Sequence, residues 1–140
     1  MDEKTLEIYN DSFEYCLSKE GFLPRFYELF MGSSAEVREK FINTDIKRQS
    51  RILKKSLYVL TMASVGTEDA RNELIRLGKT HGQQGMKIPD YMYDQWLDCL
   101  LRTVREFHTE WKPEIEASWH AMLDPHIEIL KSFVRQDATK

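Results

Sequence analysis

Histidines are the first candidates for chemistry in this sequence, because a neutral imidazole is the commonest metal ligand in proteins. His120 and His126 lie six residues apart, whereas two ligands on one helix face need a spacing of three or four. His108 lies in a polar helix end, between Glu106 and Glu110, where we expect it to be solvated. These three histidines therefore do not suggest a metal site.

His81 is the exception. It follows Leu77 by four residues at the end of an amphipathic helix, so its ring should point inward, as Leu77 does. Such a histidine is ordinarily a core residue with a hydrogen-bonded ring, and a metal ligand is the alternative. One protein nitrogen is too few to hold a bare metal ion, but it is enough for iron already held by a porphyrin.

Other chemistries find little support. The sequence has neither a nucleophile motif nor a Gly-rich phosphate loop. Cys16 and Cys99 fall on apolar helix faces and are expected to be inert buried thiols. A basic run is expected to be a solvated helix face, because no aromatic residues alternate with it; it comprises Lys47, Arg48, Arg51, Lys54 and Lys55.

Composition restricts the class of protein. The chain has 140 residues, 41% of them hydrophobic, which suits a single domain over residues 1–140. Its formal net charge of −3 argues against a nucleic-acid partner, since phosphate binders are normally basic. No segment is apolar enough to span a membrane, and no signal peptide or disulfide framework is evident. A cytoplasmic protein is the expectation.

Helical periodicity runs through the whole sequence, without the alternating pattern of strands, so we predict an all-α domain of six to eight helices. The expected helices cover 6 to about 21, Pro24 to 30, Ser33 to 41, about 46 to Gly66, Thr67 to Gly82, and two long segments opened by Pro89 and Pro113.

Three local features complete this prediction. Ser33 and Glu36 have the spacing of a capping box, and the next N-cap is expected within residues 43–45. Pro125 should kink the last helix, since the apolar spacing continues beyond it. A polar tail from about residue 135 is expected to fray.

Four segments of the sequence resemble, in their order along the chain, segments of the globin family, most closely those of single-domain bacterial globins and the haem domain of flavohaemoglobins. The segments are Phe26–Phe30 with Ser34–Phe41, Arg48–Leu53, Leu77–His81 and Tyr93–Leu101. Phe41 follows Tyr27 by 14 residues, the globin spacing from a distal aromatic to the phenylalanine that stacks on haem. This ungapped spacing favours Tyr27 over Phe26 as the distal residue.

The resemblance implies a globin fold that encloses haem b (iron protoporphyrin IX). It implies His81 as the iron ligand, with Tyr27 and Gln49 as distal donors that stabilise a bound gas. The residues expected to bind the cofactor are Phe41, Leu53, Leu77, Ile88, Tyr93, Trp96 and Leu100. Tyr93 matches the tyrosine that tunes the iron-ligating histidine in flavohaemoglobins, and for the other six plain core packing is the alternative interpretation.

The implied ligands are dioxygen, nitric oxide or carbon monoxide. One alternative is a nitric-oxide dioxygenase or nitrite reductase served by an external reductase, and another is a haem-free regulator with this fold. The flavohaemoglobin pattern has a late glutamate where this chain has Val134, and no flavin or NAD module follows. Both differences argue against a self-sufficient nitric-oxide dioxygenase. The oligomeric state stays open, with a homodimer through the last two long helices as one option.

Overall fold

The computed structural model describes residues 2–64, 68, 71–73, 75–76 and 89–138, and the regular elements in these ranges are all helices. They are α1 (Glu3–Leu17), α2 (Phe22–Met31), α3 (Ala35–Phe41), α4 (Ile46–Ser64), α6 (Asp90–Phe107) and α7 (Pro113–Ala138). The all-α prediction is therefore confirmed. No helix in the described part of the chain is long and apolar enough to cross a membrane.

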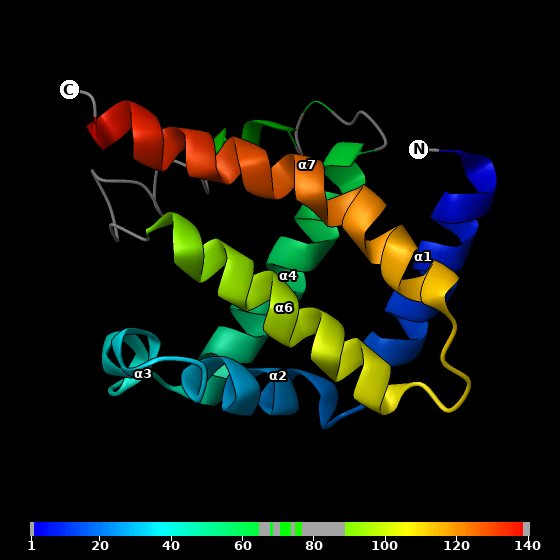
Figure 1. Ribbon diagram of the computed structural model, residues 1–140, viewed down its shortest axis with the longest axis horizontal. Coiled ribbons are helices and arrows are strands. Elements are labelled where there is room, and N and C mark those ends of the chain that lie inside the picture. The colour runs from blue at the N-terminus through cyan, green and yellow to red at the C-terminus, as the bar shows by residue number, and fades with distance from the viewer. Residues whose placement is uncertain (1, 65–67, 69–70, 74, 77–88, 139–140) are drawn as a thin grey trace.

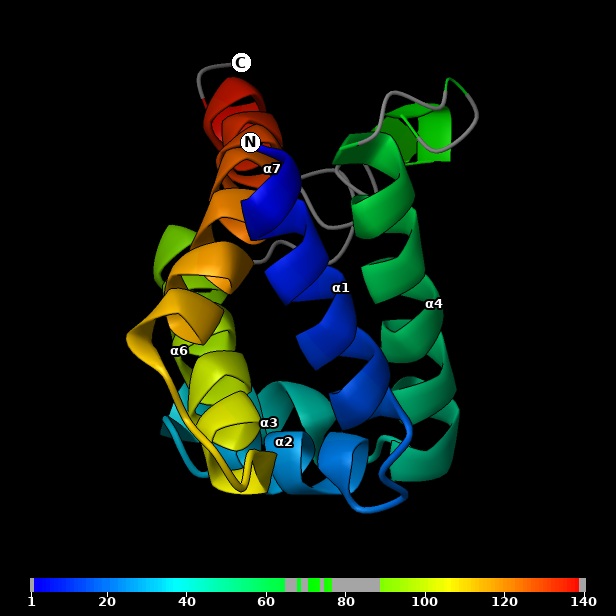
Figure 2. The ribbon, with the colours of Figure 1, turned by 90° about the vertical axis from the view of Figure 1, so that its right-hand side faces the viewer.

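The helices surround a shared interior (Figure 1). The most extensive packing joins α1 to α7 and α2 to α6. Turned by 90°, the molecule shows α4 on one side and α6 with α7 on the other, while α2 and α3 cross below them (Figure 2). This arrangement sets α4 opposite the α6–α7 pair.

The core is rich in aromatic rings. Trp119 of α7 is fully buried, and its ring centroid lies 5.0 Å from that of Tyr9 on α1. Phe13 stacks on Tyr9 at 5.5 Å. Cys16, one turn further along α1, is also fully buried, and burial raises the pKa of its thiol to about 12. Both cysteines are free and buried, as predicted for inert thiols.

Ser12 joins three segments of the chain in this core. Its Oγ accepts a hydrogen bond from Trp119 Nε1 at 2.9 Å and lies 2.7 Å from His108 Nε2. His108 is the C-cap of α6, and its half-buried ring lies 4.9 Å from that of Tyr15. The prediction of a solvated His108 is therefore wrong, because its ring packs on α1 as the chain turns towards α7.

The α3 N-cap is one residue later than predicted. Ser34 Oγ accepts a hydrogen bond from the backbone N–H of Val37, whereas Ser33 Oγ donates to the carbonyl oxygen of Phe30 at the end of α2. The predicted cap within residues 43–45 is confirmed, since Asp45 accepts from the backbone N–H of Lys47.

Prolines lie at or close to the predicted helix starts, and Pro113 is the first residue of α7, as predicted. α2 begins at Phe22, so Pro24 falls within its first turn, where a missing N–H costs no helical hydrogen bond. Pro89 is the N-cap of α6 and not its first residue. α7 continues through Pro125 to Ala138, beyond the predicted start of the polar tail.

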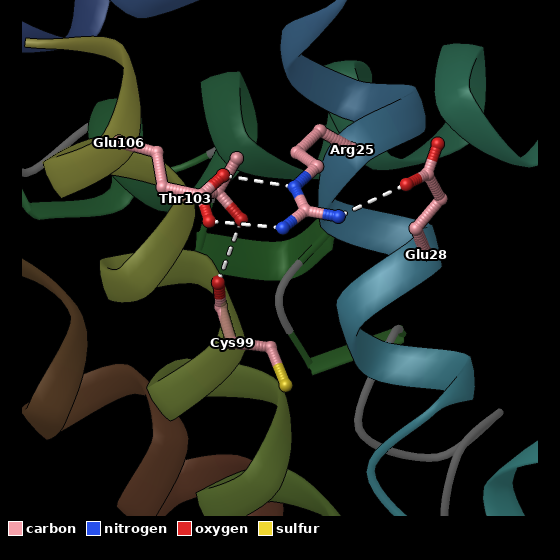
Figure 3. Close-up of polar contacts among 5 residues, drawn as sticks. All are labelled: Arg25, Glu28, Cys99, Thr103 and Glu106. Carbon is pink, nitrogen blue, oxygen red and sulfur yellow. Dashed lines mark hydrogen bonds and ion pairs between the residues drawn. The ribbon is translucent and has the colours of Figure 1, made fainter.

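A surface ion pair also joins α2 to α6 (Figure 3). The Arg25 guanidinium donates from Nε and Nη2 to the two carboxylate oxygens of Glu106, at 2.8 and 3.0 Å. Its Nη1 donates to Glu28 on the same helix as Arg25. This hydrogen bonding to Arg25 lowers the pKa of Glu106.

Candidate functional site

Tyr27 lies at the junction of α2 and α4. Its side chain is 5% exposed, and its phenol donates a hydrogen bond to the backbone carbonyl oxygen of Gln49, 3.1 Å away. Its ring centroid lies 6.4 Å from that of Phe41 at the end of α3. Burial raises the pKa of Tyr27, so the phenol keeps its proton and remains a hydrogen-bond donor. The structure thus brings together three residues of the predicted site.

Phe26, the alternative to Tyr27, faces other neighbours. It is fully buried, stacks on Phe30 at 5.5 Å and meets the Trp96 ring of α6 edge-on at 6.0 Å. Consecutive residues on a helix point about 100° apart, since a turn takes 3.6 residues. Phe26 accordingly packs against α6, while the phenol of Tyr27 reaches α4.

α4 presents an apolar face towards the interior. Gln49 is half-buried and Leu53 is buried, and the same face continues through buried Leu57 and Leu60. The spacing of four, four and three residues accounts for this stripe. The basic residues of α4 are all exposed, which confirms the prediction of a solvated face.

α6 supplies three further residues of the predicted site. Leu100 is fully buried, Trp96 is half-buried and packs against the core, and Tyr93 is 7% exposed. The phenol oxygen of Tyr93 is buried and has no hydrogen-bond partner in the described part of the chain. Burial, followed by the nearby charge of Asp90, raises the pKa of Tyr93.

The remaining predicted residues lie outside the described ranges. These are Leu77, the proposed iron ligand His81, and Ile88. Among the described residues, no group of three or more His, Cys, Asp or Glu side chains is placed to hold a metal ion.

His126 is a residue that the sequence reasoning missed. Its side chain is 7% exposed, and neither ring nitrogen has a hydrogen-bond partner among the described residues. Burial lowers the pKa of His126 and favours the neutral ring. We set it aside because of its distance from His120, although its spacing of seven from Trp119 and four from Met122 identifies it as part of the apolar face.

Among solved structures, the chain is similar to a protein from Pseudomonas aeruginosa that is described as structurally highly homologous to a human hemoglobin. The two chains are 30% identical, with a TM-score of 0.87, and the similarity covers 93% of this chain and 98% of the other. The chain belongs to the globin family. No protein-family model and no curated protein sequence matches it. The predicted globin fold is confirmed.

The described residues of this globin fit a haem group by their chemistry. A porphyrin needs a broad apolar surface, and buried Leu53 and Leu100 with half-buried Phe41 and Trp96 provide apolar groups from three helices. The unpartnered phenol of Tyr93 is the polar exception, because a buried hydroxyl without a partner is costly unless a bound group satisfies it.

Proposed function

We propose that this globin binds haem b through His81 and reversibly binds dioxygen or another diatomic gas. The observation that carries the proposal is the buried phenol of Tyr27, which meets Gln49 on α4 beside Phe41 within a globin fold. The haem would supply the iron to which the gas binds. The chain would supply His81 as its ligand and an apolar lining that excludes water.

The distal residues would act as hydrogen-bond donors. Tyr27 carries an O–H and Gln49 carries an amide N–H, and both can donate to the partial negative charge of a bound ligand. Each net hydrogen bond contributes about 1–1.5 kcal/mol, so the pair could slow ligand release roughly ten- to a hundredfold. Tyr27 must first leave the carbonyl oxygen of Gln49, to which it donates in this structure.

Tyr93 is proposed to act on the opposite side of the cofactor. The resemblance implies a tyrosine that tunes the iron-ligating histidine, and the phenol of Tyr93, which has no partner among the described residues, could do so by a hydrogen bond. Such contacts orient a ligating imidazole and tune its basicity. The role of Tyr93 would be positional and not catalytic.

The test is reconstitution of haem-free protein with haem, followed by absorption spectroscopy. We expect a Soret band that shifts on reduction and on addition of carbon monoxide, and tight stoichiometric binding. His81→Ala should weaken haem binding and change the spectrum. His120→Ala is the matched control, since this imidazole is 44% exposed on α7. A wild-type protein that takes up no haem, or His81→Ala with an unchanged spectrum, would contradict the proposal.

A further inference from the structure

His126 carries an observation that core packing does not explain. A neutral imidazole has one nitrogen that donates a hydrogen bond and one that accepts, and both nitrogens of His126 are buried without a partner among the described residues. An apolar residue of similar size would avoid this cost, because it has no polar atoms to desolvate. Among the described residues, then, nothing offsets the cost of burying this histidine.

The position of His126 on α7 shows which region it faces. Its neighbours one turn before it, Met122 and Leu123, are buried, as is Ile127. The edge of α7 next to α6 is marked by Lys131, whose Nζ donates to Asp94 at 2.6 Å. His126 lies five residues before Lys131, which places it roughly 140° around the helix from it. It thus belongs to the face turned towards the interior and not to the α6 edge.

Tyr93 lies on the neighbouring helix, beside Asp94. α6 and α7 run side by side in opposite directions (Figure 1), so the Lys131–Asp94 bond fixes the level of Tyr93 along α7. Five residues separate Lys131 from His126, which is about 7.5 Å along the helix axis. Two unpartnered polar groups, Tyr93 Oη and the His126 ring, therefore lie on the adjacent helices α6 and α7, at levels about one and a half turns apart along α7.

The helix on the opposite side, α4, also carries a buried polar group without a partner among the described residues, Ser50 Oγ. α4 lies across from α6 and α7 (Figure 2), and there the Tyr27 phenol already has a partner in Gln49. Unpartnered buried groups indicate where a hydrogen-bonding guest is missing. On the α6–α7 side these groups include Tyr93 Oη and the His126 ring, which such a guest would satisfy.

We propose that His126 is a positioning residue of the haem site, whose imidazole gains its hydrogen bond when the cofactor and its ligating histidine are in place. A histidine that binds iron through one nitrogen has the other N–H to donate, and it usually donates to a carboxylate, carbonyl or water. The neutral ring of His126 offers a lone pair to such a donor. This inference rests on the proposed function and adds a residue that supports the iron ligand.

The test compares His126→Phe with wild type in the haem-free and haem-bound states. Without haem, His126→Phe should unfold at a higher urea concentration, because two unsatisfied nitrogens are removed. The affinity of His126→Phe for haem should be about 10- to 100-fold lower than that of wild type, the usual effect of losing such a supporting contact. The iron–histidine stretching frequency of the ferrous protein, measured by resonance Raman spectroscopy, should also decrease, because the ligating imidazole loses a hydrogen-bond acceptor.

Two further variants sharpen the comparison. His126→Gln retains an acceptor and should recover part of the haem affinity and the stretching frequency. His120→Phe, on an exposed position of the same helix, should change neither. His126→Leu provides the same comparison if the phenyl ring does not fit.

The outcomes separate this inference from the proposed function. If wild type binds haem and His126→Phe and His126→Leu keep its affinity and stretching frequency, the role of His126 is refuted while haem binding stands. If wild type takes up no haem, the proposed function fails and the inference fails with it. A low-spin spectrum with two histidine ligands that disappears in His126→Phe would also refute the inference, by making His126 a direct iron ligand.

Discussion

The phenol of Tyr27 donates its hydrogen bond to the backbone carbonyl oxygen of Gln49, 3.1 Å away, and so ties α2 to the first turn of α4. The carbonyl is part of the main chain, so this contact does not depend on the Gln49 side chain. The Gln49 amide has no hydrogen bond of its own among the described residues. Before a ligand binds, the Tyr27 phenol is thus already hydrogen-bonded and the Gln49 amide is not. We therefore expect variants of the two residues to change the rate of ligand release and the equilibrium affinity in different proportions.

We expect Tyr27→Phe to release dioxygen about five- to tenfold faster, the equivalent of one hydrogen bond of roughly 1–1.5 kcal/mol. The equilibrium affinity should fall less than this, because the unliganded protein also loses its bond to Gln49. Gln49→Leu should change the dissociation rate and the affinity in parallel. Flash photolysis and stopped-flow mixing measure both constants, and equal behaviour of the two variants would contradict the proposed switch of Tyr27.

Ser12→Ala should destabilise the protein by about 2–3 kcal/mol, as it leaves the buried Trp119 Nε1–H without an acceptor. The contact with His108 is lost in the same variant. Urea unfolding followed by tryptophan fluorescence gives this difference. Ser56→Ala is the control: its hydroxyl only donates to a carbonyl one turn back, so the change should stay within about 0.5 kcal/mol.

The pH dependence of stability should carry a contribution from His108. Burial lowers its pKa below the ordinary value of 6.5, so the unfolded chain binds this proton more readily than the folded chain. The contribution to stability is complete above about pH 6.5 and is lost as the pH falls towards the folded pKa. His126 acts with the same sign in the haem-free protein.

Urea midpoints of haem-free protein between pH 7.5 and about pH 5 test this expectation. His108→Gln keeps a polar side chain beside Ser12 and should flatten the decline. His120→Gln, at an exposed position, should leave the slope as in wild type. Stability that rises on acidification over this range would be the wrong sign.

The two contacts between α2 and α6 should contribute very different amounts to the free energy of unfolding. Phe26→Ala removes a fully buried ring packed on Trp96 and should cost about 3–5 kcal/mol. Arg25→Gln breaks the ion pair with Glu106, which lies in solvent and is weakened by salt. Its effect on the urea midpoint should be small in dilute buffer and disappear in 1 M sodium chloride. A larger effect for Arg25 than for Phe26 would reverse this ranking.

The helices could be predicted from the sequence because their apolar residues recur at the helical spacing. Leu53, Leu57 and Leu60 mark the inner face of α4 in the sequence as clearly as in the structure. Helix ends were less predictable, since Ser33 and Ser34 have the same capping chemistry and differ only in which hydroxyl reaches an unpaired backbone group.

The candidate site could be predicted only in part, for a different reason. Tyr27, Gln49 and Phe41 are distant in the sequence, and it was the family spacing and not local chemistry that grouped them. His108 was misjudged because its neighbours in sequence are charged, whereas its partners Ser12 and Tyr15 come from the other end of the chain. His126 was missed because a search for ligand spacing ignores a histidine that acts alone.

The contact of Ser12 with Trp119 spans 107 residues, and α1 packs mainly against the last helix of the fold. During synthesis, the aromatic face of α1 therefore emerges from the ribosome long before α7 does. Until α7 has been synthesised, Tyr9, Phe13 and Cys16 form an exposed apolar surface on the nascent chain, the kind of surface that aggregates or binds chaperones. Expression yield should thus depend on how quickly the final third of the polypeptide follows.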